Sequence, residues 1–195
     1  EQSQWQLFTK RLEEHFASLV SNYSILYASQ YDFYYHLEDL LNQICTYWLE
    51  RHTELKELDT ARYNNPDWFQ SNQMIGAVCY VDRFARDLVG LDRRIPYIEE
   101  LGINYLHLMP LFAVPESEND GGYAVSSYRE VNPKLGNMQE LRTLTAHLHQ
   151  KGVSLVLDLI YNHTADNHVW FNIYLFVSKI YNFGCCNRII DVLIT

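Results

Sequence analysis

The sequence predicts an α/β protein in which an all-helical segment precedes parallel strands that alternate with helices. Residues 1 to about 65 show helical spacing of apolar side chains and no strand-like alternation bounded by Gly or Pro. From residue 74 onward, three short apolar runs rich in β-branched residues occur, and a helical segment that ends at a glycine separates each run from the next. Apolar strands without polar alternation are typical of parallel strands covered by helices.

The helical segment shows one repeated apolar face. Its members recur every three to four residues and are Leu37, Leu40, Leu41, Ile44 and Trp48. Charged residues that favour a solvated helix follow between Glu50 and Glu57. The segment is expected to end near Asn64-Asn65-Pro66, so residues 1–65 are predicted to form a helical N-terminal domain.

The first strand is predicted over 75–81 and is followed by a helix over 91–101 that closes at Gly102. The second strand is predicted over 103–109 and stops at Pro110. A long segment over 112–135, rich in Gly, Pro, Ser and Asn, is expected to be a loop.

The next helix is predicted over 137–151, because Asn137 is a good N-cap and Glu140 three residues later completes a capping box. Gly152 ends this helix, and the third strand is predicted over 153–160. This order fits either the start of a parallel (β/α)₈ barrel or the start of a doubly wound sheet. A complete barrel needs about 250 residues, so 195 residues could hold only part of one.

Composition excludes some classes of partner. The net charge of −9 disfavours nucleic acid, because phosphate binding needs clustered Lys and Arg. The apolar run after Trp170 is too short and interrupted for a membrane span, and no secretory signal opens the chain. The four cysteines show no metal-ligand spacing, so we expect no metal site, free thiols and a cytoplasmic location. The first residue is Glu1, which indicates that the true start lies upstream.

The first candidate site follows the second predicted strand at Asp120-Gly121-Gly122-Tyr123. Two glycines allow a tight turn that brings a carboxylate and an aromatic ring into one cavity. The tyrosine face can stack on a sugar ring, and the carboxylate can accept hydroxyl hydrogen bonds or pair with an arginine. The alternative is an ordinary Asp-Gly turn with a packed tyrosine.

The second candidate site lies where the third predicted strand ends. Period-2 geometry places Asp158 and Ile160 on one face, so a carboxylate stands where an apolar side chain is usual. Buried carboxylates need a partner and are enriched at functional sites. His163 could donate to a substrate hydroxyl, although a lone histidine can also be structural. The Asp-x-x-x-Asn-His spacing of Asp158, Asn162 and His163 favours a functional unit.

These residues resemble a known family. Residues 158–163 are similar to the first signature region of the α-amylase family, glycoside hydrolase family 13. Within that family, the runs 67–69 and 120–129 resemble the amylosucrases, as does the helical front with residues 30–36. The resemblance covers about residues 5–170, and it implies the first part of a (β/α)₈ TIM barrel, with about three strands, preceded by an all-helical domain.

The resemblance implies roles for five residues. Tyr123 is expected to stack on the glucosyl ring, His163 to bind its hydroxyls, and Asp120 to pair with a later arginine at the pocket floor. Asp158 is the supporting signature aspartate, and Asn162, a calcium ligand in many α-amylases, is expected to be structural here, with no metal or other cofactor. The family's catalytic carboxylates follow the fourth and fifth strands, so no catalytic residue is assigned among residues 1–195.

The expected activity of the parent enzyme is a retaining transfer of glucosyl from sucrose to α-1,4-glucan. This chain is expected to be inactive, and its partners are expected to be sucrose and α-glucan, with no nucleic acid and no membrane. A sucrose or α-glucan hydrolase of the same family, a non-catalytic sugar-binding remnant and a non-functional product are the alternatives. Residues 66–170 are expected to be the barrel part, and 171–195 a divergent tail outside the family fold.

Overall fold

The structure is a computed structural model that describes residues 2–117 and 119–173. It divides into two compact units, Glu1–Pro66 and a second unit that begins at Asp67. Most of the expected tail, residues 174–195 with Cys185 and Cys186, lies outside the described residues. Cys45 and Cys79 are free thiols.

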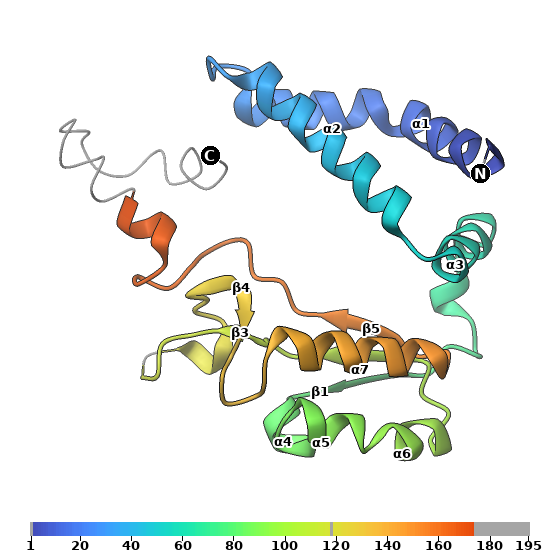
Figure 1. Cartoon of the computed structure of the whole chain (residues 1–195), viewed down its shortest axis with the longest axis vertical. Coiled ribbons are helices and arrows are strands. Elements are labelled where there is room, and N and C mark those ends of the chain that lie inside the picture. Colours follow the sequence, from blue (N-terminus) through green and yellow to red (C-terminus); the bar gives the residue numbers. More distant parts are fainter. Residues whose placement is uncertain (1, 118, 174–195) are drawn as a thin grey trace. The chain divides into compact units, whose positions relative to one another are not determined.

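The first unit consists of the helices α1 (Gln2–Tyr27), α2 (Phe33–Glu50) and α3 (Thr53–Asn64), which confirms the predicted helical front (Figure 1). The five apolar residues predicted to share a face of α2 are all half-buried. Phe8 of α1 is buried, and its ring centroid lies 5.6 Å from that of Trp48. The repeated apolar face of α2 therefore packs as its spacing predicted.

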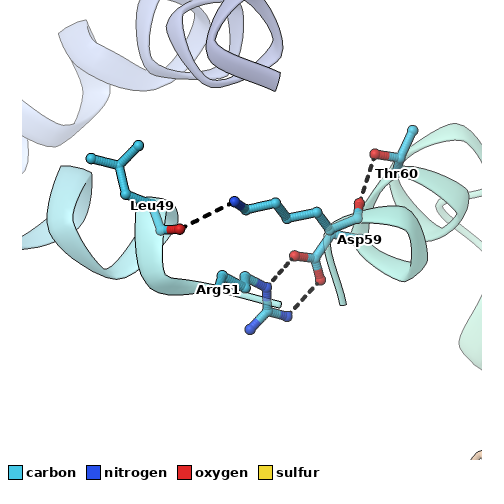
Figure 2. A network of polar contacts seen from close by, with 5 residues as sticks. Leu49, Arg51, Asp59 and Thr60 are labelled. Carbon is cyan, nitrogen blue, oxygen red and sulfur yellow. Dashed lines mark hydrogen bonds and ion pairs between the residues drawn. The ribbon is translucent and has the colours of Figure 1, made fainter. Parts of the chain in front are cut away.

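A polar network holds the turn between α2 and α3 (Figure 2). Arg51 donates from Nε and Nη2 to the two carboxylate oxygens of Asp59, at 2.6 and 2.9 Å. Lys56 differs from the expected solvated stretch, because only 9% of its surface is exposed. Its ammonium lies 5.3 Å from the Trp48 ring centroid and donates to the Leu49 carbonyl at 3.4 Å. An aromatic face and a carbonyl replace part of the water that this charge loses.

The second unit contains a parallel sheet whose strand order is β1-β2-β5. The strands β1 (Gly76–Cys79), β2 (Tyr105–Leu108) and β5 (Ser154–Leu157) are shorter than the runs that predicted them. The register pairs Cys79 with Leu108 and Leu108 with Leu157, so all three strands end at the same edge.

Four helices accompany the sheet: α4 (Val81–Ala85), α5 (Leu88–Asp92), α6 (Ile95–Glu100) and α7 (Met138–Gln150) (Figure 1). Their buried residues form one core cluster with alternate residues of the strands, and Leu106 and Leu108 of β2 are almost fully buried in it. The intervening residues of the strands face the other side of the sheet, and among them Val78 is 63% exposed. Helices therefore cover the same face of all three strands.

This arrangement fits the predicted barrel. A (β/α)₈ barrel adds parallel strands in sequence and keeps its helices on the outer face. One half of a doubly wound sheet also has three sequential strands with helices on one face, so the strand order fits both folds. The second unit is a parallel sheet of three strands, in agreement with the predicted first part of a TIM barrel.

Two predicted elements differ in the structure. The helix expected over 91–101 is two short helices, α5 and α6, with Pro96 in the first turn of the second. Pro96 has no N–H to donate to a carbonyl four residues earlier, so a continuous helix is interrupted there. The loop expected over 112–135 contains an antiparallel pair, β3 (Phe112–Ala113) and β4 (Ser127–Val131).

The predicted capping box of α7 is present. The Asn137 side chain accepts from the backbone N–H groups of Gln139 and Glu140 at 2.9 and 3.0 Å. The Glu140 carboxylate accepts from the Asn137 N–H at 3.1 Å, so three backbone N–H groups at the start of the helix have acceptors.

No helix in the described ranges is long and apolar enough to cross a membrane.

Candidate functional site

The candidate site lies at the carboxyl edge of the sheet, where the segments after β2 and β5 approach each other. The Tyr123 hydroxyl donates to Oδ2 of Asp158 at 3.0 Å, across 35 residues of sequence. Both side chains are partly buried. The carboxyl ends of parallel strands are where α/β enzymes place their binding groups, so this pair is in the expected location for a site.

Asp158 is held by its backbone as well as by its side chain. The regular strand β5 ends at Leu157, but the Asp158 N–H still donates to the Leu108 carbonyl at 3.2 Å. The hydrogen-bond ladder with β2 therefore continues one residue further and fixes the backbone position from which the carboxylate extends. Ile160 does not continue the strand; it is buried in a second cluster with Phe112 and Val125.

Tyr123 is placed by a tight turn at Asp120–Gly122, labelled η2. The backbone is left-handed at three successive residues, with φ of 48° at Asp120, 68° at Gly121 and 99° at Gly122. A Cβ at Gly122 would lie 3.2 Å from Cβ of Pro110, so glycine is needed there for both conformation and space. The turn that the paired glycines predicted is present.

The electrostatics of the pair favour a neutral tyrosine. Partial burial raises the pKa of Tyr123 above its ordinary value of 10.0, and the Asp158 carboxylate that accepts its hydrogen bond raises it further. The Tyr80 side chain, at the end of β1, adds to the same shift. Tyr123 therefore keeps its proton and can hold the carboxylate in one orientation at neutral pH.

The other predicted site residues are more exposed. Asp120 lies on the exposed side of its turn, and Asn162 and His163 are exposed after β5. Within residues 2–117 and 119–173, no hydrogen bond or ion pair joins the side chains of these three residues to Tyr123 or Asp158. The structure thus brings together two of the five predicted residues by direct contact.

An open hollow of ≈ 840 Å³ borders the same turn. Gly121 and Gly122 line it together with Tyr80, Pro110 and Asn119. Charged side chains of both signs, Asp82, Arg83, Glu116 and Lys134, also line it. The mixed lining offers hydrogen-bond donors and acceptors rather than a single strong charge.

One residue of this edge was not singled out from the sequence. The Tyr128 hydroxyl donates to the backbone carbonyl of Ile160, and it lies 3.3 Å from the carbonyl of His163. Tyr128 lies in the run 120–129 that resembles the amylosucrases, but that resemblance implied no role for it, and this chain has fifteen tyrosines. Its partners lie 32 and 35 residues away in sequence, so local patterns could not identify it.

Among the described residues, no group of three or more His, Cys, Asp or Glu side chains is placed to hold a metal ion.

The comparison with known protein families decides between the two folds that the strand order fits, and it confirms the predicted TIM barrel. The model of the alpha amylase catalytic domain matches residues 59–176, more than half of the chain. The chain belongs to the α-amylase family. The match includes β1, β2 and β5 and both segments of the candidate site.

Relatives in this family differ in activity. The chain is 36% identical over 85 residues to an oligo-1,6-glucosidase of Parageobacillus thermoglucosidasius. The matched region covers 44% of this chain and 15% of that enzyme. It is 40% identical over 85 residues to a trehalose synthase of Thermus thermophilus, covering 44% of this chain and 8% of that enzyme. The chain therefore spans a small fraction of the length of these α-amylase-family relatives.

A solved structure of the trehalulose synthase MutB from Pseudomonas mesoacidophila MX-45 is also similar. The identity is 30% and the TM-score 0.46, with 51% of this chain and 19% of that chain covered.

Proposed function

We propose that residues 66–170 supply part of a glucosyl-binding pocket of an α-amylase-family enzyme that acts on sucrose or α-glucan. The hydrogen bond between Tyr123 and Asp158 carries the proposal, because it joins an aromatic ring and a carboxylate at the carboxyl edge of the barrel strands. The helical residues 1–65 form a separate N-terminal domain in this proposal.

The chemistry of a sugar ring suits this edge. A hexose presents C–H groups that can stack on an aromatic face and hydroxyls that bind carboxylates, amides and imidazoles. Tyr123 would provide the face, with its hydroxyl already anchored on Asp158. Exposed His163 and Asp120 would bind hydroxyls or, for Asp120, pair with an arginine from a later part of the barrel.

Retaining cleavage of a glycosidic bond needs two carboxyl groups about 5–5.5 Å apart, one as nucleophile and one as acid and base. By resemblance to the family, both follow later strands than β5. We therefore expect these 195 residues to bind sugar without turnover, and the activity to belong to the complete barrel.

The most specific form of the proposal is an amylosucrase-like glucosyltransferase, which moves glucosyl from sucrose onto α-1,4-glucan. The run from Asp120 to Arg129 and the helical front support it by resemblance. A hydrolase of α-glucan or sucrose is the second candidate, and the identity to an oligo-1,6-glucosidase favours it equally.

Isothermal titration calorimetry of the 195-residue chain with sucrose and with maltose tests the proposal. We expect measurable binding that Tyr123→Ala weakens by about tenfold or more, since one aromatic contact contributes roughly 1.4 kcal/mol. Tyr31→Ala is the matched control, because this side chain in the helical unit is 98% exposed, and it should leave binding unchanged. Absence of heat with either sugar, in a folded protein, would contradict the proposal.

The two activities are separated by their products. Incubation with sucrose should release no fructose, and incubation with an isomalto-oligosaccharide should release no glucose, because the catalytic pair is expected elsewhere. Release of either product would show a catalytic pair within these residues and would identify which of the two activities it performs.

A further inference from the structure

The segment that carries His163 has no regular secondary structure of its own. Strand β5 ends at Leu157, and residues 158–168 form no strand or helix. A binding histidine needs a defined backbone, because displacement of a side chain by about 1 Å weakens a site strongly. Contacts from elsewhere in the fold must therefore fix this segment.

Those contacts come from residues 125–128, at the start of β4. The Ala165 N–H donates to the Val125 carbonyl at 2.8 Å, and the Ser126 hydroxyl donates to Oδ1 of Asn167 at 2.7 Å. The Tyr128 hydroxyl donates to the Ile160 carbonyl and lies 3.3 Å from the His163 carbonyl. These hydrogen bonds are spread along residues 160–167. Of the three donor and acceptor groups, only the Tyr128 hydroxyl binds the turn that contains His163.

The ring of Tyr128 is itself held on several sides. Its centroid lies 5.9 Å from Phe112, 5.5 Å from His168 and 5.7 Å from Trp170, and it is stacked on Trp170. Ring contacts of this kind restrict both side-chain torsions, so the direction of the hydroxyl is set before it meets the carbonyls. Burial raises the pKa of Tyr128, and the nearby Tyr161 raises it further, which keeps the donor proton in place at neutral pH.

We propose that Tyr128 is a positioning residue for the sugar site. By donating to the 160–163 turn, it fixes the backbone from which His163 extends, at the edge where Tyr123 and Asp158 meet. The inference rests on the proposed function for the role of His163, but the positioning itself is a property of the backbone and can be measured without a ligand.

The deciding variant is Tyr128→Phe, which keeps the aromatic ring and removes only the hydroxyl. The matched control is Tyr161→Phe, since Tyr161 is a neighbouring ring at 5.9 Å whose side chain is 71% exposed. If the ring alone matters, the two variants behave alike. If the hydroxyl positions the turn, only Tyr128→Phe changes it.

The first measurement is ¹⁵N relaxation of the full chain, with the backbone amides of residues 161–164 as reporters. We expect their order parameters to fall from about 0.85, the rigid value, toward 0.6 in Tyr128→Phe, and to stay unchanged in Tyr161→Phe. The His163 ring resonance should shift in the first variant only. Unchanged order parameters in Tyr128→Phe, with β1, β2 and β5 amides still dispersed, would overturn the inference.

A second variant covers the case in which Tyr128→Phe fails to fold. Ser126→Ala removes the neighbouring hydrogen bond to Asn167. With Tyr128 intact, it should lower the order parameters of residues 165–168 and leave those of 161–163 unchanged. Loss of order over 161–163 in Ser126→Ala would show that the segment is held as a whole, and it would also overturn the specific role of Tyr128.

The second measurement is sugar affinity. Loss of one hydrogen bond costs about 0.5–1.5 kcal/mol, so Tyr128→Phe should weaken maltose or sucrose binding by roughly 2- to 12-fold. If no variant binds sugar, the parent chain included, the proposed function fails, whereas the order parameters still decide whether Tyr128 positions the turn.

Discussion

At the scale of single residues, Asp158 shows how a charged side chain is kept at the end of a buried strand. Its N–H extends the ladder to Leu108, and its carboxylate accepts from Tyr123. A half-buried carboxylate without a donor would lose hydration and gain nothing in return. The tyrosine supplies that donor from a distant segment, so the same hydrogen bond satisfies the aspartate and fixes the ring.

The coupling between these two residues can be measured. Asp158→Asn removes the charge and keeps an acceptor oxygen, so the pKa of Tyr123 should fall but stay above 10.0, because burial is the larger cause of its shift. Tyrosine labelled with ¹³C at Cζ, followed by NMR through an alkaline titration, gives the value. Asp166→Asn, an exposed aspartate in the same segment, is the control and should leave the pKa of Tyr123 unchanged.

The sign of the stability effect follows from the direction of this shift. The pKa of Tyr123 is raised on folding, so its contribution is fully present below about pH 10 and is lost as the pH rises through the folded value. The stability difference between the parent chain and Tyr123→Phe should therefore narrow in alkaline solution. A difference that grows with pH would contradict the assignment.

The sequence could single out Asp158 and Tyr123 because each stands in a local pattern: a carboxylate in an apolar strand, and an aromatic residue after two glycines. The hydrogen bond then brings the two together. Tyr128 lies in the run 120–129 that resembles the amylosucrases, but nothing in that run indicates which residues it contacts. Its role depends on contacts with residues 32 to 42 positions away, and these exist only in the folded chain.

At the scale of elements, α7 is the helix whose ends the sequence defined best. Asn137→Ala removes the acceptor for two backbone N–H groups, and we expect a loss of about 1 kcal/mol in unfolding free energy. Asn137→Ser keeps a capping oxygen and should lose only a small part of that. Urea denaturation followed by circular dichroism measures both variants, and equal losses in the two would show that capping is not the cause.

The elements that the sequence missed are short or irregular. β3 has two residues and lies in a stretch rich in Gly, Pro and Ser, so no alternation can form there that is long enough to recognise. The division between α5 and α6 depends on one proline within an otherwise helical apolar pattern. Hydrophobic periodicity gave the long helices and the order of the buried strands, because both depend on repeated contacts with one core.

At the scale of the whole molecule, the division into two compact units separates two kinds of stability. The helical unit is held by side-chain packing between three helices and by the Arg51–Asp59 pair, with exposed fractions of 37% and 27%. A partly exposed bidentate pair contributes on the order of 1 kcal/mol, so packing dominates. The barrel unit depends chiefly on the larger of its two core clusters, which lies between the sheet and its helices. A defect in that cluster should therefore weaken the barrel unit by itself.

Leu108→Ala tests this independence. Leu108 has an exposed fraction of 0% and lies in the central strand, so its truncation should cost about 2–5 kcal/mol. Hydrogen exchange followed by mass spectrometry should show faster exchange over residues 76–79, 105–108 and 154–157, and unchanged exchange in α1–α3. Val78→Ala is the control in the adjacent strand β1: this side chain is 63% exposed, so exchange in the sheet should change little. Faster exchange of α1–α3 in Leu108→Ala would mean that the two units unfold as one, because only a shared transition can carry a core defect of the barrel unit into the helices.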